Sequence, residues 1–205
     1  MSAAPAPRST RLDGFRVLGF LIALMWLSEI VDSAAGHRLD QYGIEPRDDD
    51  GLIGIPAAPF LHAGFGHLIA NTVPFLVLGA VIALSGLRLV LLVTLVVALV
   101  SGLGTWLLAP SGTLHVGASG VVFGYAAYLI ARGLFDRRWY YLVTGLVVAL
   151  VQGGSLLLGL LPRDGISWQG HLFGALGGLL AARLLARRPK TVQPGRTIRP
   201  TGVQR

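Results

Sequence analysis

The chain contains 205 residues, of which 53% are hydrophobic and only 13% are charged; this argues against a water-soluble domain, whose surface needs more charge. Cysteine is absent, which excludes disulfide bonds and thiolate metal sites. The formal net charge is +7, but the basic residues fall at the ends of apolar runs, an arrangement typical of membrane proteins, so nucleic acid is not a predicted partner.

Six apolar segments follow one another along the chain, and each is long enough to cross the hydrocarbon core of a bilayer, which takes about 20 helical residues. They are residues 15–32, 67–86, 88–108, 116–134, 139–161 and 167–186. We therefore predict an all-α polytopic protein of the lipid bilayer, with six transmembrane helices in a membrane domain over residues 13–187. The ends, 1–12 and 188–205, are Pro-rich, basic and poor in apolar residues, which predicts disorder.

Basic residues in the connections predict the orientation of these spans. An even number of spans leaves both termini on one side of the membrane. If that side is the cytoplasm, 14 of the 17 Lys and Arg residues are cytoplasmic, and the remaining 3 lie outside: Arg38, Arg47 and Arg163. This distribution obeys the positive-inside rule, so both termini are predicted to be cytoplasmic in a multi-pass protein of the plasma membrane.

An alternative for the N-terminal part is a cleaved signal peptide, since residues 1–36 combine a basic start, an apolar stretch and a Ser-Ala-Ala-Gly sequence. Glu29 and Asp32 argue against cleavage, because they interrupt the region before the supposed cleavage point. In a retained first span these two carboxylates end the helix at the outer interface, where we expect them to be solvated.

Polar side chains recur in the first turns of the second, fourth and sixth predicted helices, all of which run from the outside to the cytoplasm. The second helix carries His67 and Asn71, the fourth carries Ser119, and the sixth carries His171. At a rise of about 1.5 Å per residue, these side chains reach a similar depth below the outer surface. Polar groups at such depth are energetically expensive, so their convergence predicts a functional site.

The residue types in this layer restrict the chemistry. A serine hydroxyl is a poor nucleophile at neutral pH unless a base removes its proton, and His171 lies at the right depth to be the base for Ser119. No carboxylate shares the layer, so a Ser-His dyad is the most that the spans can form. His67 and Asn71, four residues apart, lie on one helix face and could donate hydrogen bonds to an oxyanion.

Glycines spaced four residues apart occur on both helices that carry the serine and the histidine. They are Gly120 and Gly124 in the fourth predicted helix and Gly170, Gly174 and Gly178 in the sixth. Such Gly-xxx-Gly faces let two helices pack with close backbones. We therefore expect Ser119 and His171 to come within hydrogen-bond distance of each other.

At these positions the sequence resembles the rhomboid family of intramembrane serine proteases, over residues 15–187. Three motifs of that family occur in the same order: His62-xxxx-His67-xxx-Asn71, Gly117-Ala118-Ser119-Gly120 and His171-xx-Gly174-xxx-Gly178. The resemblance implies that Ser119 is the nucleophile and His171 the general base. It also implies an oxyanion hole made by His67, Asn71 and the backbone N–H of Ser119.

The resemblance further implies that His62 and Gly117 shape the site, next to the packing glycines Gly120 and Gly174. Substrates would be single-span membrane proteins, cleaved near the outer side of the membrane in a site that opens towards the extracytoplasmic side. No metal or organic cofactor is expected. Bacterial members often place a Tyr that stacks on the catalytic histidine where this chain has Phe123, which keeps the ring.

One further departure is that the loop 51–60 lacks the Trp-Arg pair often found in the family, which leaves open how this loop is seated in the membrane.

Other interpretations of the sequence are weaker. A catalytically inactive rhomboid-like protein that binds membrane clients would be expected to have lost the serine or the histidine. A transporter or channel would be expected to bury charges near the middle of the bilayer. A metal pair of His62 and His67 has no third ligand nearby, and its spacing fits no zinc motif.

Overall fold

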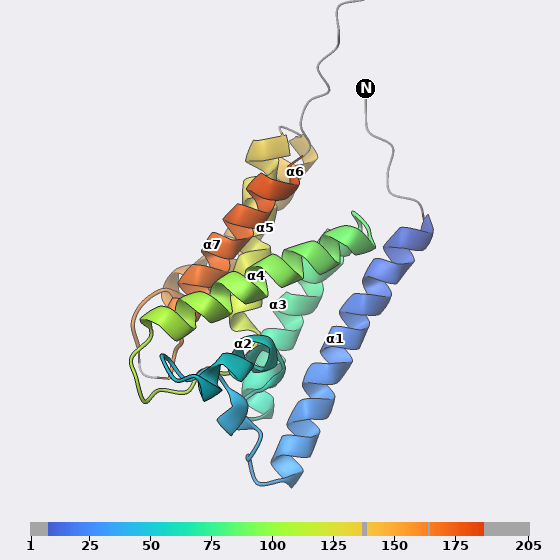
Figure 1. The fold of residues 1–205 in the computed structure, drawn as a ribbon. Helices are drawn as coiled ribbons and strands as arrows, with labels where there is room; N and C mark the ends of the chain where they lie inside the picture. The colour runs from blue at the N-terminus through green and yellow to red at the C-terminus, as the bar shows by residue number, and fades with distance from the viewer. Residues whose placement is uncertain (1–7, 137–138, 164, 187–205) are drawn as a thin grey trace, which may run out of the picture.

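The structure is a computed structural model that describes residues 8–136, 139–163 and 165–186 (Figure 1). Every regular element in these ranges is a helix. The long helices are α1 (Arg8–Ala34), α3 (Phe65–Ala83), α4 (Leu87–Leu108), α5 (Ser119–Asp136), α6 (Trp139–Gly159) and α7 (Trp168–Leu185). The connection between α1 and α3 holds the short elements η1 (Asp40–Tyr42), η2 (Asp50–Ile53), α2 (Gly54–Ala57) and η3 (Ala58–Phe60).

The outer surface of the bundle is apolar. In the part of the chain that the structure describes, α1, α3 and α4 are long and apolar enough to cross a membrane, and α5 is apolar over a shorter length. Large aliphatic side chains such as Leu95, Leu99 and Leu150 are exposed, as expected where helices face lipid rather than water. The prediction of an all-helical membrane protein is therefore confirmed.

The helix boundaries differ in detail from the predicted segments, for local backbone reasons. Each segment coincides with one long helix, but α1 begins at Arg8 and so includes part of the segment 1–12 that is predicted to be disordered. The fourth helix begins at Ser119 rather than at residue 116. Gly117 has a φ of +113° and donates its N–H to the Ala58 carbonyl, so the chain cannot be helical there. The tail 188–205 lies outside the described residues.

Helix α5 is the centre of the bundle and packs against α3, α4, α6 and α7 (Figure 1). Its Tyr125 and Tyr128 are among the largest fully buried side chains. At the edge of the bundle, α1 lies along α3 and α4 and buries Leu18 and Met25. Through these side chains α1 contributes to the hydrophobic core of the bundle.

The contact between α5 and α7 is made by glycine backbones, as the four-residue spacing predicts. A Cβ atom added at Gly174 would overlap the carbonyl oxygen of Gly120, and one added at Gly178 would overlap that of Gly124. No side chain separates the two helices at these positions, so their backbones touch. This close approach sets the distance between the residues at the start of each helix.

The expectation that Glu29 and Asp32 are solvated is wrong. Both are 1% exposed, because the segment after α1 folds back over the end of that helix. The backbone N–H of Leu39 donates a hydrogen bond of 2.6 Å to Oδ1 of Asp32. The two carboxylates near the C-terminal end of α1 are therefore covered by protein rather than by water.

Candidate functional site

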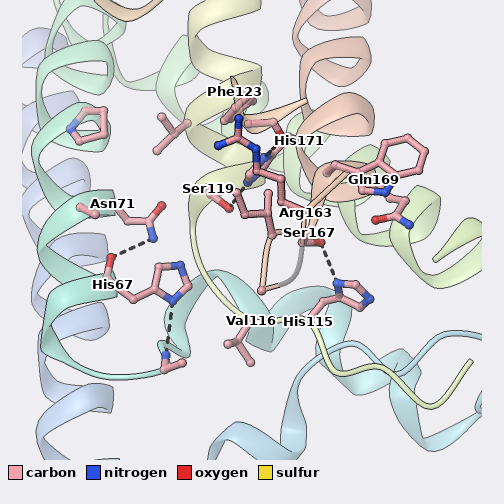
Figure 2. A pocket seen from close by; sticks show the side chains of 18 of the residues that line it. His67, Asn71, His115, Val116, Ser119, Phe123, Arg163, Ser167, Gln169 and His171 are labelled. Atoms are coloured by element: carbon pink, nitrogen blue, oxygen red, sulfur yellow. Dashed lines mark hydrogen bonds between the residues drawn. The ribbon is translucent and has the colours of Figure 1, made fainter. Parts of the chain in front are cut away.

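A cavity of about 1300 Å³ lies at the end of the bundle where α3, α5 and α7 begin. Its walls include all four side chains of the predicted polar layer, which are His67, Asn71, Ser119 and His171. Figure 2 shows that three helices contribute them and that they face a common space. The structure therefore brings together the residues that the sequence places at one depth.

Ser119 and His171 are hydrogen-bonded: Oγ of Ser119 lies 2.8 Å from Nε2 of His171. The other ring nitrogen, Nδ1, lies 2.7 Å from the carbonyl oxygen of Gly159. A carbonyl oxygen can only accept a hydrogen bond, so Nδ1 must carry the proton. Nε2 is then the free acceptor, and the serine hydroxyl is its donor.

The orientation of the His171 ring is fixed on its face as well as at its edge. The ring of Phe123 stacks on it, with centroids 4.1 Å apart and an angle of 6° between the planes. A Cβ atom at Gly159 would lie 2.5 Å from the Phe123 ring and 3.1 Å from Nδ1 of His171, so only glycine fits beside this stacked pair. The phenylalanine thus supplies the stacking surface expected at this position.

His67 and Asn71 lie on the side of the cavity that faces Ser119 (Figure 2). Nδ1 of His67 is 3.4 Å from the backbone N–H of Ala63, which leaves Nε2 as the N–H donor of the neutral ring. Nδ2 of Asn71 donates one proton to the His67 carbonyl at 3.1 Å and keeps a second N–H. Both side chains can therefore donate a hydrogen bond into the cavity.

Gly117 creates the space between these donors and the serine. A Cβ atom at this position would lie 2.7 Å from Cε1 and 2.8 Å from Nε2 of His67, and 3.6 Å from Nδ2 of Asn71. Its φ of +113° also disfavours any residue with a side chain. The glycine keeps open the volume in front of the two donors.

His62 does not line the cavity but lies behind it, and only 1% of the residue is exposed. Its ring meets that of His67 edge-on with centroids 5.2 Å apart, and its Nε2 is 3.5 Å from the backbone N–H of Ala118. Burial, together with the neighbouring His67, lowers the pKa of His62 to about 4. The imidazole is therefore neutral at pH 7 and can accept a hydrogen bond beside the serine.

Two residues at the site are not predicted from the sequence. His115 joins the loop before α5 to the loop before α7, since its Nδ1 lies 2.8 Å from Oγ of Ser167. Ser101 of α4 donates a hydrogen bond of 2.8 Å to the carbonyl oxygen of Gly170, next to His171. His115 lies in a loop, and Ser101 follows a long apolar run, so neither belongs to the polar layer of helix starts.

The fold and the cavity define a class, the helical integral membrane proteins that enclose a polar site at one end of the bundle. A match to the rhomboid domain covers residues 50–188, and the chain belongs to the rhomboid family. The resemblance seen in the three sequence motifs is thus confirmed.

Relatives extend this result. An uncharacterized protein of Mycobacterium tuberculosis (strain ATCC 25618 / H37Rv) is 47% identical over 184 residues, which cover 85% of this chain and 76% of that protein. An uncharacterized protein of Mycobacterium leprae (strain TN) is 44% identical over 184 residues, covering 85% of this chain and 72% of the relative. The Bacillus subtilis (strain 168) protein "Putative rhomboid protease YdcA" is 30% identical over 129 residues, covering 62% of this chain and 64% of its own.

Proposed function

We propose that this protein is an intramembrane serine endopeptidase, in which Ser119 is the nucleophile and His171 the general base. The observation that carries the proposal is the 2.8 Å hydrogen bond between Ser119 Oγ and His171 Nε2 inside the cavity. The tautomer implied by the Gly159 contact leaves Nε2 unprotonated and aimed at the hydroxyl, which is the arrangement that a base needs.

The reaction follows from this arrangement. As Ser119 Oγ attacks a peptide carbonyl, its proton passes to Nε2 of His171, and the resulting imidazolium is stabilised by the Gly159 carbonyl that accepts from Nδ1. Collapse of the tetrahedral intermediate breaks the peptide bond, and His171 returns the proton to the leaving amine. Water then attacks the acyl-enzyme with His171 again as the base, which releases the second product.

The negative charge of the tetrahedral intermediate needs donors on the side opposite His171. His67 Nε2–H, the free N–H of Asn71 and the backbone N–H of Ser119 are the groups suited to this role. The Ser119 N–H is the first of α5 and has no intrahelical partner. Gly117 leaves room for the oxyanion in front of the two side chains.

We also propose six membrane spans, cytoplasmic termini and a cavity that opens to the extracytoplasmic side of the plasma membrane. The six long helices and the excess of Lys and Arg on one side support this topology. Helices α3, α5 and α7 begin at the cavity end, which is the end poor in basic residues.

The proposed substrates are single-span membrane proteins. In a transmembrane helix, the N–H and C=O groups of the peptide bonds are hydrogen-bonded to one another. A segment must therefore unwind before one of its carbonyl groups can reach Ser119. Small residues near the cleaved bond favour such unwinding, and a polar cavity can satisfy the backbone groups that are released.

An activity-based probe tests the proposal directly. A fluorophosphonate is expected to label the purified protein at Ser119, because the unprotonated Nε2 of His171, 2.8 Å away, activates this hydroxyl. Ser119→Ala should abolish labelling, whereas Ser111→Ala, in the exposed loop between α4 and α5, should not. Capture of single-span proteins without any labelling would contradict the proposal and would instead identify a rhomboid-like protein that binds membrane clients.

The oxyanion donors lead to a second prediction. His67→Ala and Asn71→Ala are each expected to lower kcat by about 10²- to 10³-fold, with a smaller effect on KM, because the hydrogen bonds form mainly in the transition state. Reporter cleavage at several substrate concentrations measures both constants. Thr72→Val is the matched control. Thr72 follows Asn71 on α3, its hydroxyl donates a hydrogen bond to the Leu68 carbonyl, and it does not line the cavity. Full activity in both alanine variants would exclude an oxyanion role.

A further inference from the structure

A second cluster of potential ligands lies at the C-terminal end of α1, among residues that do not line the cavity of Ser119. It consists of Asp32 in the last turn of the helix, and His37 and Asp40 in the segment that follows. One carboxylate oxygen of each Asp and one ring nitrogen of the His all lie within 4.8 Å of one another. These residues precede the part of the chain that matches the rhomboid domain, which begins at residue 50.

Asp32 is buried and Asp40 is half-buried, and both carboxylates are incompletely bonded. Asp32 and the neighbouring Glu29, three residues earlier on the same helix, are each 1% exposed. Among the described residues, one oxygen of each of three carboxylates has no hydrogen-bond partner; these are Glu29 Oε2, Asp32 Oδ2 and Asp40 Oδ1. Asp32 Oδ2 points to Nδ1 of His37 at 3.3 Å. Buried oxygens of this kind are costly unless a positive group compensates for them.

The protein supplies little positive charge to these carboxylates. The ion pairs within the described ranges join Arg16 to Asp13 and His37 to Asp32, so no Lys or Arg reaches the cluster there. The C-terminal end of α1 carries the negative end of the helix dipole and adds to the unfavourable potential.

We propose that Asp32, His37 and Asp40 bind a divalent transition-metal ion of the Zn²⁺ type, with Glu29 as a further carboxylate beside it. An imidazole ligand with carboxylates favours Zn²⁺ over Mg²⁺ or Ca²⁺, which prefer all-oxygen sites. The His37 side chain is 54% exposed, so an ion can approach from solvent and water can complete its coordination. The ion would tie the segment after α1 to the end of that helix.

Equilibrium dialysis of the untagged, chelator-treated full chain against ZnCl₂ tests the site, with thermal unfolding as a second measurement. We expect one Zn²⁺ per chain and a higher unfolding temperature. His37→Gln and Asp40→Asn should each weaken Zn²⁺ binding by at least about tenfold, the lower end of the loss seen when even an outer-shell partner is removed. Asp49 is an exposed carboxylate in the same connection, so Asp49→Asn should bind Zn²⁺ as tightly as the unchanged chain does. Ser119→Ala should also leave Zn²⁺ binding unchanged.

His37 is a surface residue, so its variant is expected to fold whether or not Asp32 and Asp40 variants do. Zn²⁺ binding that is equally strong in His37→Gln and Asp40→Asn would overturn the site. Binding of Ca²⁺ in preference to Zn²⁺, independent of His37, would overturn the assignment to a transition metal. If Zn²⁺ does not bind, the proposal is wrong; a higher unfolding temperature on acidification alone would then show that protons compensate for the carboxylates.

Discussion

Ser119→Ala and His171→Ala are each expected to lower kcat/KM for a single-span reporter by at least about 10⁴-fold, and the double variant no further. In the proposed mechanism the two groups act as one unit, because the hydroxyl attacks only if Nε2, 2.8 Å away, removes its proton. Once either group is absent, the other cannot contribute. Non-additivity therefore distinguishes a dyad from two independent contributions.

Cleavage by the purified protein in proteoliposomes, followed by gel analysis of the reporter fragments, measures this effect. Ser111→Ala controls for the loss of an exposed hydroxyl, and unfolding temperatures show whether each variant is folded. Activity within tenfold of the unchanged protein in His171→Ala would contradict the role of His171 as base. Losses in the two single variants that multiply in the double variant would contradict a shared step.

Gly174→Ala is expected to destabilise the bundle by about 3 kcal/mol, at the upper end of the usual cost of overpacking. The added Cβ would overlap the Gly120 carbonyl oxygen, and a backbone atom cannot rotate away as a side chain can. Helices α5 and α7 would have to separate, which moves Ser119 away from His171. A displacement of about 1 Å is enough to cost on the order of 10² in rate, so activity should fall in molecules that remain folded.

Unfolding in increasing amounts of a denaturing detergent measures the change in the free energy of unfolding. Reporter cleavage in mild detergent measures the change in the cleavage rate. Gly19→Ala is the matched control, because a Cβ atom on this α1 residue meets nothing within 4 Å. It should leave activity unchanged and stability equal or slightly increased, since alanine favours helix over glycine by about 1 kcal/mol. If Gly174→Ala and Gly19→Ala changed stability and activity equally, the backbone contact at Gly174 would not be what positions Ser119 next to His171.

Much of the architecture is predictable because it depends on local properties of the chain. The apolar runs predict the six long helices, since the bilayer thickness requires about 20 residues for each crossing. The shared depth of His67, Asn71, Ser119 and His171 follows from the helix rise and the alternating direction of the spans. The stacking of Phe123 on His171 follows from the motif, because a phenyl ring fills the place of a phenol.

Other features depend on contacts between distant segments, which have no local pattern. His62 lies outside the helices, and its approach to Ala118 spans 56 positions along the chain. The hydrogen bond of His115 with Ser167 spans 52 positions and joins two loops. Glu29 and Asp32 end an apolar run, a position that predicts solvation, but the segment that covers them is polar and has no helical period.

The sequence by itself determined the class of protein, the helices and the common level of the four polar residues at the helix starts, because hydrophobic length and helix rise are properties of each segment alone. The tertiary structure decided that Ser119 and His171 touch, which ring nitrogen of His171 is free, and that the acidic end of α1 is buried. Each of these depends on how closely two backbones approach, and glycines set that approach only when both helices are in place.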